Sequence, residues 1–330
     1  MTLLTDRYRR PIDYLRVSIT DRCNLRCIYC MPFGGVSKLT HDDILSYEEF
    51  LRLVKVAIKM GISKVRLTGG EPLVRRGVTD FCRHLAALPG MKSLSLTTNG
   101  VLLEELAQEI YQAGIRRINI SLDTLQPERF SRMTCRDEFD RVWRGIQTAE
   151  KVGFHPIKIN VVVMGGINDD EVVQLAQLTK DRPYHIRFIE FMQFINNDRL
   201  IPHHFVSAED ILGRLHSVAP LEQVTSRHSN GPARHFRWPD AQGMIGIISP
   251  ISHHFCPSCN RIRLTADGKL RNCLFSDREL DIKLPLRQGA TDAELAQLLT
   301  ESIINKPEKH ALQSDLFRKC QNRPMVAIGG

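Results

Sequence analysis

The chain has 330 residues, of which 42% are hydrophobic and 25% charged, a composition that is ordinary for a globular protein with a full core. Its formal net charge of +8 favours an anionic partner. No apolar run approaches the about 20 residues that cross a bilayer, and the charged first residues lack the apolar stretch of a signal peptide. We therefore expect a cytoplasmic protein that does not associate with membranes.

Short strand-like runs alternate with amphipathic helical stretches from about residue 14 to residue 215. Helical patterns cover residues 46–60, 78–88, 102–113, 139–152 and 170–180, and Ser46 with Glu49 predicts a capping box at the first. Alternating strands and helices predict an α/β fold with a parallel sheet, which is either an open doubly wound sheet or a barrel, and the number of units is smaller than in a complete TIM barrel. The predicted strands are Leu15–Ile19, Lys64–Thr68, Ser93–Thr97, Arg117–Ser121, Ile157–Val163 and Ile186–Phe191.

A polar stretch rich in turn signals interrupts this alternation at about residues 222–243. Cysteine-containing segments and one helical pattern near 291–305 follow it. We therefore predict a larger α/β domain over residues 1–220 and a smaller C-terminal domain over residues 221–330.

Six of the nine cysteines form two groups of three. The cytoplasm keeps thiols reduced and rarely uses disulfides, so grouped cysteines there indicate metal binding. Three further cysteines stand alone and are expected to be small core residues. The first group is Cys23, Cys27 and Cys30, the second is Cys256, Cys259 and Cys273, and the single ones are Cys82, Cys135 and Cys320.

Three thiolates on one loop suit a soft metal centre, and the spacing leaves two kinds open. A structural zinc site needs four ligands, and no fourth cysteine or histidine lies near the first group. An iron–sulfur cluster held by three cysteines would keep one iron open for a ligand. In the second group His253 or His254 could complete a zinc site.

Unusual polar motifs follow the ends of several predicted strands. In parallel α/β folds, residues at the carboxyl ends of the strands meet at one face, so the motifs predict one active site. They are Gly69-Gly70-Glu71-Pro72, Thr97-Thr98-Asn99-Gly100, Ser121-Leu122-Asp123 and Glu190-Phe191-Met192, together with the first cysteine group.

Basic residues occupy several of the predicted strands and the segment after the second cysteine pair. The chain has no P-loop, and its basic clusters lack interleaved aromatic residues, so a pocket for a small anion is favoured over nucleic-acid binding. Any one of these residues could instead be ion-paired. The candidates are Arg16, Lys64, Arg66, Lys158, Arg261 and Arg263, with Arg187 and Asn160 as further lining residues.

The spacing Cys23-x-x-x-Cys27-x-x-Cys30, followed by Gly69-Gly70-Glu71-Pro72, resembles the motifs of the radical S-adenosylmethionine (SAM) superfamily. The resemblance implies an incomplete (βα)6 TIM-like barrel, a [4Fe–4S] cluster on the three cysteines and SAM bound at its open iron. The smaller C-terminal domain would then carry a second cluster.

The segment Cys256-Pro257-Ser258-Cys259-Asn260-Arg261-Ile262-Arg263, with Cys273 and the terminal Gly329-Gly330, is similar to the GTP 3′,8-cyclase family. That resemblance implies a second [4Fe–4S] cluster on Cys256, Cys259 and Cys273, and a tail that supports catalysis through Gly329, Gly330 and Arg263. It implies SAM contacts from Tyr29, Gly70, Ser121 and Met192. It implies GTP contacts from Arg16, Lys64, Arg66, Thr97, Lys158, Arg261, Ile262 and Arg263.

The family resemblance also implies the reaction and the partners. A 5′-deoxyadenosyl radical from SAM would remove hydrogen from C3′ of GTP, and C3′ would bond to C8, giving (8S)-3′,8-cyclo-7,8-dihydroguanosine 5′-triphosphate. Such a lyase opens molybdenum cofactor biosynthesis, takes electrons from an unidentified donor, supplies cyclic pyranopterin monophosphate synthase and forms a homodimer.

Two other functions compete with this one. A peptide-modifying radical SAM enzyme would usually carry more C-terminal cysteines. A zinc-stabilised nucleic-acid-binding protein would leave Gly69-Gly70-Glu71-Pro72 unexplained.

Overall fold

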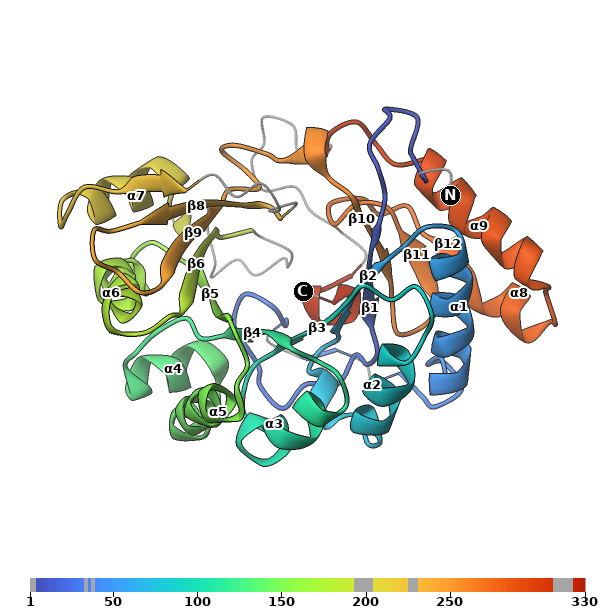
Figure 1. The fold of residues 1–330 in the computed structure, drawn as a ribbon, viewed down its shortest axis with the longest axis horizontal. Helices are drawn as coiled ribbons and strands as arrows, with labels where there is room; N and C mark the ends of the chain where they lie inside the picture. Colours follow the sequence, from blue (N-terminus) through green and yellow to red (C-terminus); the bar gives the residue numbers. More distant parts are fainter. Residues whose placement is uncertain are drawn as a thin grey trace.

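Six parallel strands follow one another in chain order around the centre of the molecule (Figure 1). The computed structural model describes residues 4–32, 35–36, 39–192, 204–224, 231–310 and 323–329. Every predicted strand is present, with bounds shifted by no more than one residue. The strands are β1 Tyr14–Ser18, β2 Lys64–Thr68, β3 Ser93–Thr98, β4 Arg117–Ser121, β5 Ile157–Val163 and β6 His185–Glu190.

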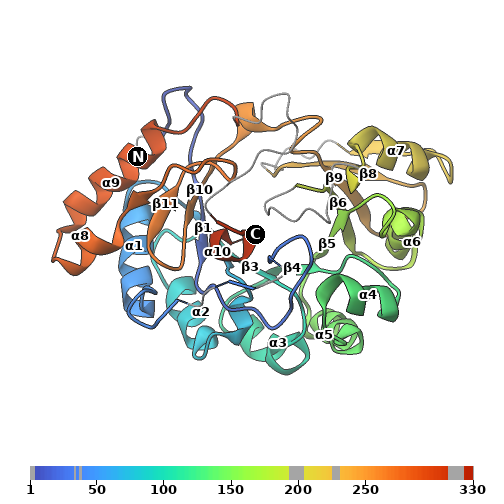
Figure 2. The ribbon, with the colours of Figure 1, turned by 180° about the vertical axis from the view of Figure 1, so that it is seen from behind.

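The helices between these strands cover the outside of the curved sheet (Figures 1 and 2). The predicted capping box is confirmed, since Glu49 N–H donates to Ser46 Oγ at 3.2 Å and Ser46 N–H donates to Glu49 Oε2 at 2.7 Å. The helix α4 was not predicted, because it is short and buries few apolar side chains. These helices are α1 Tyr47–Lys59, α2 Val78–Ala86, α3 Leu103–Gln112, α4 Pro127–Thr134, α5 Phe139–Val152 and α6 Val172–Asp181.

The C-terminal part of the chain extends both edges of the same sheet. Strand β9 (Met244–Ile248) pairs in parallel with β6, and β10 (Arg261–Leu264) pairs in parallel with β1. Short antiparallel strands continue outward, so the described order is β12-β11-β10-β1-β2-β3-β4-β5-β6-β9-β8-β7. These outer strands are β7 Glu222–Val224, β8 Ala233–Arg237, β11 Lys269–Arg271 and β12 Leu280–Asp281.

The stretch predicted as a break, residues 222–243, therefore contains two strands, the edge strand β7 and its neighbour β8. Both strands are short, and β7 is largely exposed. Neither contains the apolar run by which a strand is predicted from the sequence. The division of the chain at residue 220 stays a prediction.

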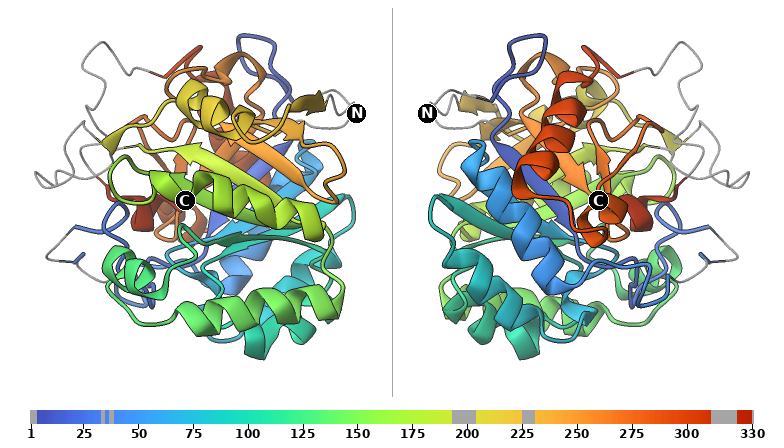
Figure 3. Two further views of the ribbon diagram at one scale, coloured as in Figure 1. Left: turned by 90° about the vertical axis from the view of Figure 1, so that its left-hand side faces the viewer. Right: turned by 90° about the vertical axis from the view of Figure 1, so that its right-hand side faces the viewer.

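The remaining helices lie around the two sheet edges. Helix α7 (Ala208–His216) packs on α6, and α9 (Asp292–Ile304) packs on α1 (Figures 1 and 3). The short α8 (Lys283–Arg287) precedes α9, and α10 (Met325–Ile328) lies in the middle of the barrel in Figure 2. Within the described residues, no helix is long and apolar enough to cross a membrane.

Side chains alternate between the two faces of each strand. In β1 and β2 the apolar residues Leu15 and Val65 are buried in the main core, while Arg16 and Arg66 line the barrel interior. Because successive side chains point to opposite faces, this alternation separates an apolar shell under the helices from a polar interior.

Candidate active site

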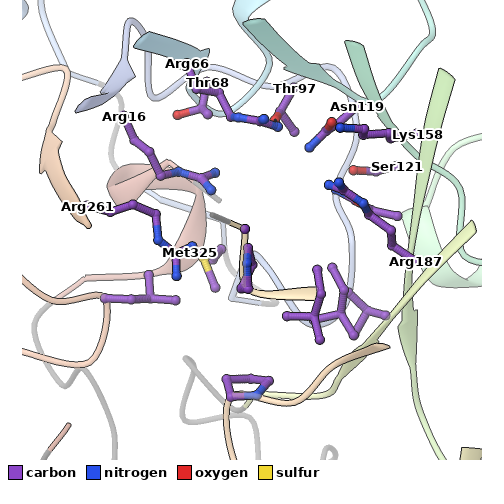
Figure 4. A pocket seen from close by; sticks show the side chains of 18 of the residues that line it. Arg16, Arg66, Thr68, Thr97, Asn119, Ser121, Lys158, Arg187, Arg261 and Met325 are labelled. Atoms are coloured by element: carbon purple, nitrogen blue, oxygen red, sulfur yellow. The ribbon is translucent and has the colours of Figure 1, made fainter. Parts of the chain in front are cut away.

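A single cavity of about 630 Å³ occupies the barrel interior, and both cysteine groups line it. Almost all predicted site residues line the same cavity, and Figure 4 shows Arg16, Arg66, Lys158 and Arg187 directed into one space. The predicted residues found there are Tyr29, Gly70, Ser121, Met192, Arg16, Lys64, Arg66, Thr97, Lys158, Arg261, Arg263, Arg187, Asn160 and the six grouped cysteines.

Two predicted residues do not line the cavity and one cannot be assessed. The Ile262 side chain is 1% exposed and belongs to the apolar core, opposite Leu15 on β1. Gly329 reaches the barrel, where Arg263 Nη1 donates to its carbonyl oxygen at 2.6 Å. Gly330 lies outside the described residues. Of the single cysteines, Cys82 is buried as predicted, whereas Cys135, which ends α4, is exposed, so that prediction was wrong for Cys135. Cys320 lies outside the described residues.

The loop that carries the first cysteine group rests on α4. Arg26 N–H donates to Thr134 O at 2.8 Å, and Ile28 N–H donates to Met133 O at 2.9 Å. Burial raises the pKa of Cys30 to about 12, and the charge of Cys23 adds to the effect. Burial, followed by the charges of Cys30 and Asp123, likewise raises the pKa of Cys27 well above its ordinary value. The three thiols are therefore close enough to interact electrostatically.

The Gly69-Gly70 turn packs directly against the segment before Cys23. Gly70 N–H donates to Thr20 O at 2.7 Å, and Glu71 N–H donates to Arg22 O at 2.8 Å. A Cβ atom on Gly69 would lie 2.8 Å from Thr20 O, and one on Gly70 would overlap Arg22 O. Glycine is required at both positions because the two backbones touch.

Buried glutamates connect neighbouring loops at the carboxyl ends of the strands. Glu71, after β2, accepts from Thr98 Oγ1 at 2.7 Å and from Asn99 N–H at 2.6 Å, both at the end of β3. Glu171 accepts from Leu125 N–H at 2.7 Å, and Glu190 accepts from Ile251 N–H at 2.9 Å. Each carboxylate satisfies donors of the adjacent loop and so fixes the rim of the cavity.

Asp123 joins β4, β5 and the first cysteine loop. Its Oδ1 accepts from Val162 N–H at 2.8 Å, and its Oδ2 accepts from Tyr29 OH at 2.7 Å. Burial raises the pKa of Asp123 to about 6, although these two hydrogen bonds oppose the rise.

The second cysteine group lies among cations. Cys256 starts a short 3-10 turn, η4 (Cys256–Ser258), and Cys259 N–H donates to Cys256 O at 3.1 Å. Burial would raise the pKa of Cys259, but the charges of Lys306 and Arg261 lower it to about 7. Lys306 also donates to Arg261 O at 3.0 Å and to Asn272 O at 2.5 Å, which fixes the segments flanking Cys259 and Cys273.

The histidines that could complete a zinc site differ in position. His253 is largely exposed and its Nε2 contacts Glu209 on α7. His254 lines the cavity, and its ring centroid lies 5.3 Å from that of His310. Within the described ranges, no three His, Cys, Asp or Glu side chains are arranged to hold a single metal ion.

The cavity is strongly basic between the two cysteine groups. Burial, with the charges of Arg187 and Arg66, lowers the pKa of Lys158 to about 7, and burial lowers that of Arg263 to about 10. Lys64 is partly neutralised, because its Nζ lies 2.8 Å from Asp13 Oδ2. Among the described lining residues the acidic ones are Glu71 and Asp123, so the cavity is built for an anion.

Comparison with known proteins assigns both halves of the chain. Residues 17–179 match the radical SAM superfamily, and residues 184–312 match the family described as Molybdenum Cofactor Synthesis C. The chain is 49% identical over 327 residues to the GTP 3′,8-cyclase of Moorella thermoacetica, covering 99% of this chain and 100% of that protein. It is 49% identical over 323 residues to the GTP 3′,8-cyclase of Gloeobacter violaceus, covering 97% and 99%. The chain belongs to the GTP 3′,8-cyclase family.

Solved structures agree with this assignment at the level of the fold. Streptococcus suis SuiB bound to S-adenosylmethionine has a TM-score of 0.62 and 14% identity, covering 82% of this chain and 63% of that one. SuiB bound to its precursor peptide SuiA has a TM-score of 0.63 and 14% identity, covering 97% and 72%. The predicted radical SAM α/β fold is therefore confirmed.

Radical SAM membership implies SAM and an iron–sulfur cluster, and the first cysteine group of this GTP 3′,8-cyclase family member fits such a cluster. Three half-buried cysteine thiols line the cavity, and thiolates are the donor set that iron–sulfur clusters take. Leu25 N–H and Asn99 Nδ2 approach Cys23 Sγ at 3.4 and 3.7 Å, as donors to a cluster ligand would.

The sequence prediction missed several lining residues of the cavity. Tyr14, Asn119 and His185 each lie two residues from a predicted site residue on the same strand. The signal was the period-two alternation itself, because residues two apart on a strand share a face.

Proposed function

We propose that this chain cyclises GTP to (8S)-3′,8-cyclo-7,8-dihydroguanosine 5′-triphosphate, the first step of molybdenum cofactor biosynthesis. The observation that carries the proposal is one cavity lined by two three-thiol groups with a set of cations between them. A nucleoside triphosphate spanning that space would meet one thiol group near its base and the cations along its phosphates. The full-length similarity to GTP 3′,8-cyclases supports the same substrate.

Cys23, Cys27 and Cys30 would hold the first cluster. Bound there, the cluster and SAM supply a one-electron cleavage that starts radical chemistry. Tyr29, Gly70, Ser121 and Met192 would contact SAM, and three features support this: Tyr29 is fixed by Asp123, Gly70 exposes backbone beside the cysteine loop, and all four line the cavity. The enclosed barrel would exclude water from the reacting atoms.

A second iron–sulfur cluster on Cys256, Cys259 and Cys273 would face the first across the cavity. The lowered pKa of Cys259 supports thiolate ligation there, because Lys306 and Arg261 stabilise the negative charge that a ligand cysteine carries. The open iron of that cluster would hold the guanine base of GTP.

The triphosphate would bind to the basic residues of β1, β2, β5 and β10. Arg66 Nη1 lies 3.3 Å from Thr97 Oγ1, so the two side chains could act on one phosphate, and Lys158 lies on the same side of the cavity, beside Asn119 (Figure 4). Ile262 would contribute through its backbone only. Arg263, Gly329 and Gly330 would support catalysis at the first cluster. The GTP-binding set is Arg16, Lys64, Arg66, Thr97, Lys158, Arg261, Ile262 and Arg263.

The proposed activity also implies the partners of the protein and its cellular compartment. We expect a cytoplasmic homodimer, since a reducing compartment preserves the thiols. An electron donor that is not identified would reduce the first cluster, and cyclic pyranopterin monophosphate synthase would take the product.

The test is an anaerobic assay of the reconstituted protein with SAM, dithionite and GTP. We expect 5′-deoxyadenosine and the cyclised nucleotide together, both lost in Cys27→Ala and both kept in Cys82→Ala, a buried cysteine on α2 outside the cavity. Cys259→Ala should lower bound iron by about half while SAM cleavage persists. A brown protein that makes 5′-deoxyadenosine but leaves GTP intact would reject the cyclase assignment, and a colourless zinc protein would reject the radical chemistry.

A further inference from the structure

The last described segment, residues 323–329, ends inside the barrel. Ile328 is 1% exposed and packs with Met192 and Phe275, and Figure 4 shows Met325 beside the cavity near Arg261. A Cβ atom on Gly329 would lie 2.5 Å from Thr68 Oγ1, so the tail passes close to the ends of β1 and β2. The tail therefore contacts the cavity at several points but is connected to it through few hydrogen bonds.

Arg323, the first residue of this segment, is held by two carboxylates. Its Nη1 and Nη2 donate to Asp267 Oδ1 and Oδ2 at 2.9 and 2.6 Å, and its Nε lies 2.9 Å from Glu279 Oε1. The side chains of Arg323, Asp267 and Glu279 are 19, 13 and 18% exposed. A two-pronged, largely buried pair of this kind is stronger than an exposed ion pair.

The carboxylate partners are themselves fixed. Asp267 lies in the turn between β10 and β11, and its Oδ1 also accepts from Thr265 Oγ1 at 2.6 Å. Glu279 contacts Arg271 on β11, whose side chain is fully buried. The hairpin of β10 and β11 therefore holds the tail at two points. Asp267 in its turn binds Arg323, and Arg263 on β10 binds the carbonyl oxygen of Gly329.

We propose that Arg323, clamped by Asp267 and Glu279, is the positioning residue that seats the C-terminal tail in the active-site cavity. This inference rests on the proposed function, because it assigns the clamp a role in the same reaction. With Arg323 fixed, only residues 324–329 must be ordered to bring Gly329 to Arg263. Without that attachment, the contacts of residues 324–329 alone must hold the tail in the cavity against conformational entropy.

Hydrogen–deuterium exchange and kinetics on the anaerobically reconstituted enzyme test the clamp. In Arg323→Ala we expect the Ala327 and Gly329 amides to exchange at least about tenfold faster, because a largely buried charge pair is broken. The peptides of α9 should keep their protection. The kcat for the cyclised nucleotide should fall by a similar factor while KM for GTP changes less, because the tail bonds one residue of the proposed GTP-binding set, Arg263, whereas Arg66 is held by Thr97 and Lys64 by Asp13.

Three further variants sharpen the test. Arg278→Ala removes an exposed arginine of the same region and should change neither readout. Arg323→Lys keeps the positive charge but lacks the planar guanidinium that bonds both carboxylate oxygens of Asp267. It should restore part of the protection of the tail amides from exchange. Asp267→Asn weakens the same ion pair by removing the charge of its acidic partner, and it should raise the exchange rates of the tail amides and lower kcat as Arg323→Ala does. This variant also tests the clamp if Arg323→Ala fails to fold.

Unchanged tail exchange in both clamp variants would overturn the proposal, and so would faster exchange with full kcat. The exchange measurement does not depend on turnover. If the wild-type enzyme leaves GTP unchanged, the proposed function fails, while the tail exchange of Arg323→Ala still decides whether the clamp exists.

Discussion

At the scale of single residues, the electrostatics of the cavity are set by several basic side chains that line it close to one another. Burial and the charges of Arg187, Arg66 and Arg117 lower the pKa of Lys158 to about 7. A lysine is charged below its pKa and neutral above it. His185 and His235, whose pKa values burial lowers to about 3 and about 4, stay neutral throughout this range.

Binding of the triphosphate should therefore take up a proton on Lys158. As pH rises above about 7, the affinity for GTP should fall by up to about tenfold per pH unit, the limit for one linked proton. Calorimetry of GTP binding over this range measures the dependence, and above about pH 7 the phosphates are already ionised. Lys158→Arg keeps the charge and should make the profile flatter, so equal profiles for the two proteins would contradict the assignment.

At the scale of elements, buried carboxylates connect the ends of neighbouring strands and set the rim of the cavity. Glu190 at the end of β6 is fully buried and accepts from Ala208 N–H at 2.9 Å, Ile251 N–H at 2.9 Å and Ser252 N–H at 3.0 Å. It thus joins β6, the start of α7 and the loop that leads to the second cysteine group.

Replacing Glu190 should destabilise the fold, because several buried donors would lose their acceptor. We expect Glu190→Ala to lower the free energy of unfolding by about 3 kcal/mol or more. Anaerobic denaturant titration measures the change. Glu209→Ala on the neighbouring α7 removes an exposed carboxylate and should have a small effect by comparison. Equal effects of the two substitutions would show that Glu190 does not connect these segments.

At the scale of the whole molecule, the two family segments share one sheet. Strand β10 adds to the β1 edge and β9 adds to the β6 edge, so both open edges of the six-stranded barrel are covered by C-terminal strands. Sheet edges with unpaired backbone groups promote aggregation. The first 220 residues alone would leave both edges of the barrel sheet unpaired.

The two segments should consequently unfold together. The chain has two tryptophans, Trp143 on α5 and Trp238 after β8, one in each segment. Single-tryptophan variants, Trp143→Phe and Trp238→Phe, should give coincident denaturation midpoints after correction for the stability change of each substitution. Fluorescence in a denaturant series measures them, and two separate transitions would show independent domains instead.

The sequence by itself determined the six barrel strands, most barrel helices and the six grouped cysteines, because hydrophobic periodicity, capping residues and motif spacing are local properties of the chain. It also predicted the cations of the cavity, since polar residues at alternate strand positions must share a face. Tertiary structure alone decided three things: that Ile262 turns into the core, that Glu71, Glu171 and Glu190 connect the loops, and that Arg323 meets Asp267. Each of these depends on contacts between residues distant in the chain or on which face of a strand lies inward, and no local pattern encodes such contacts.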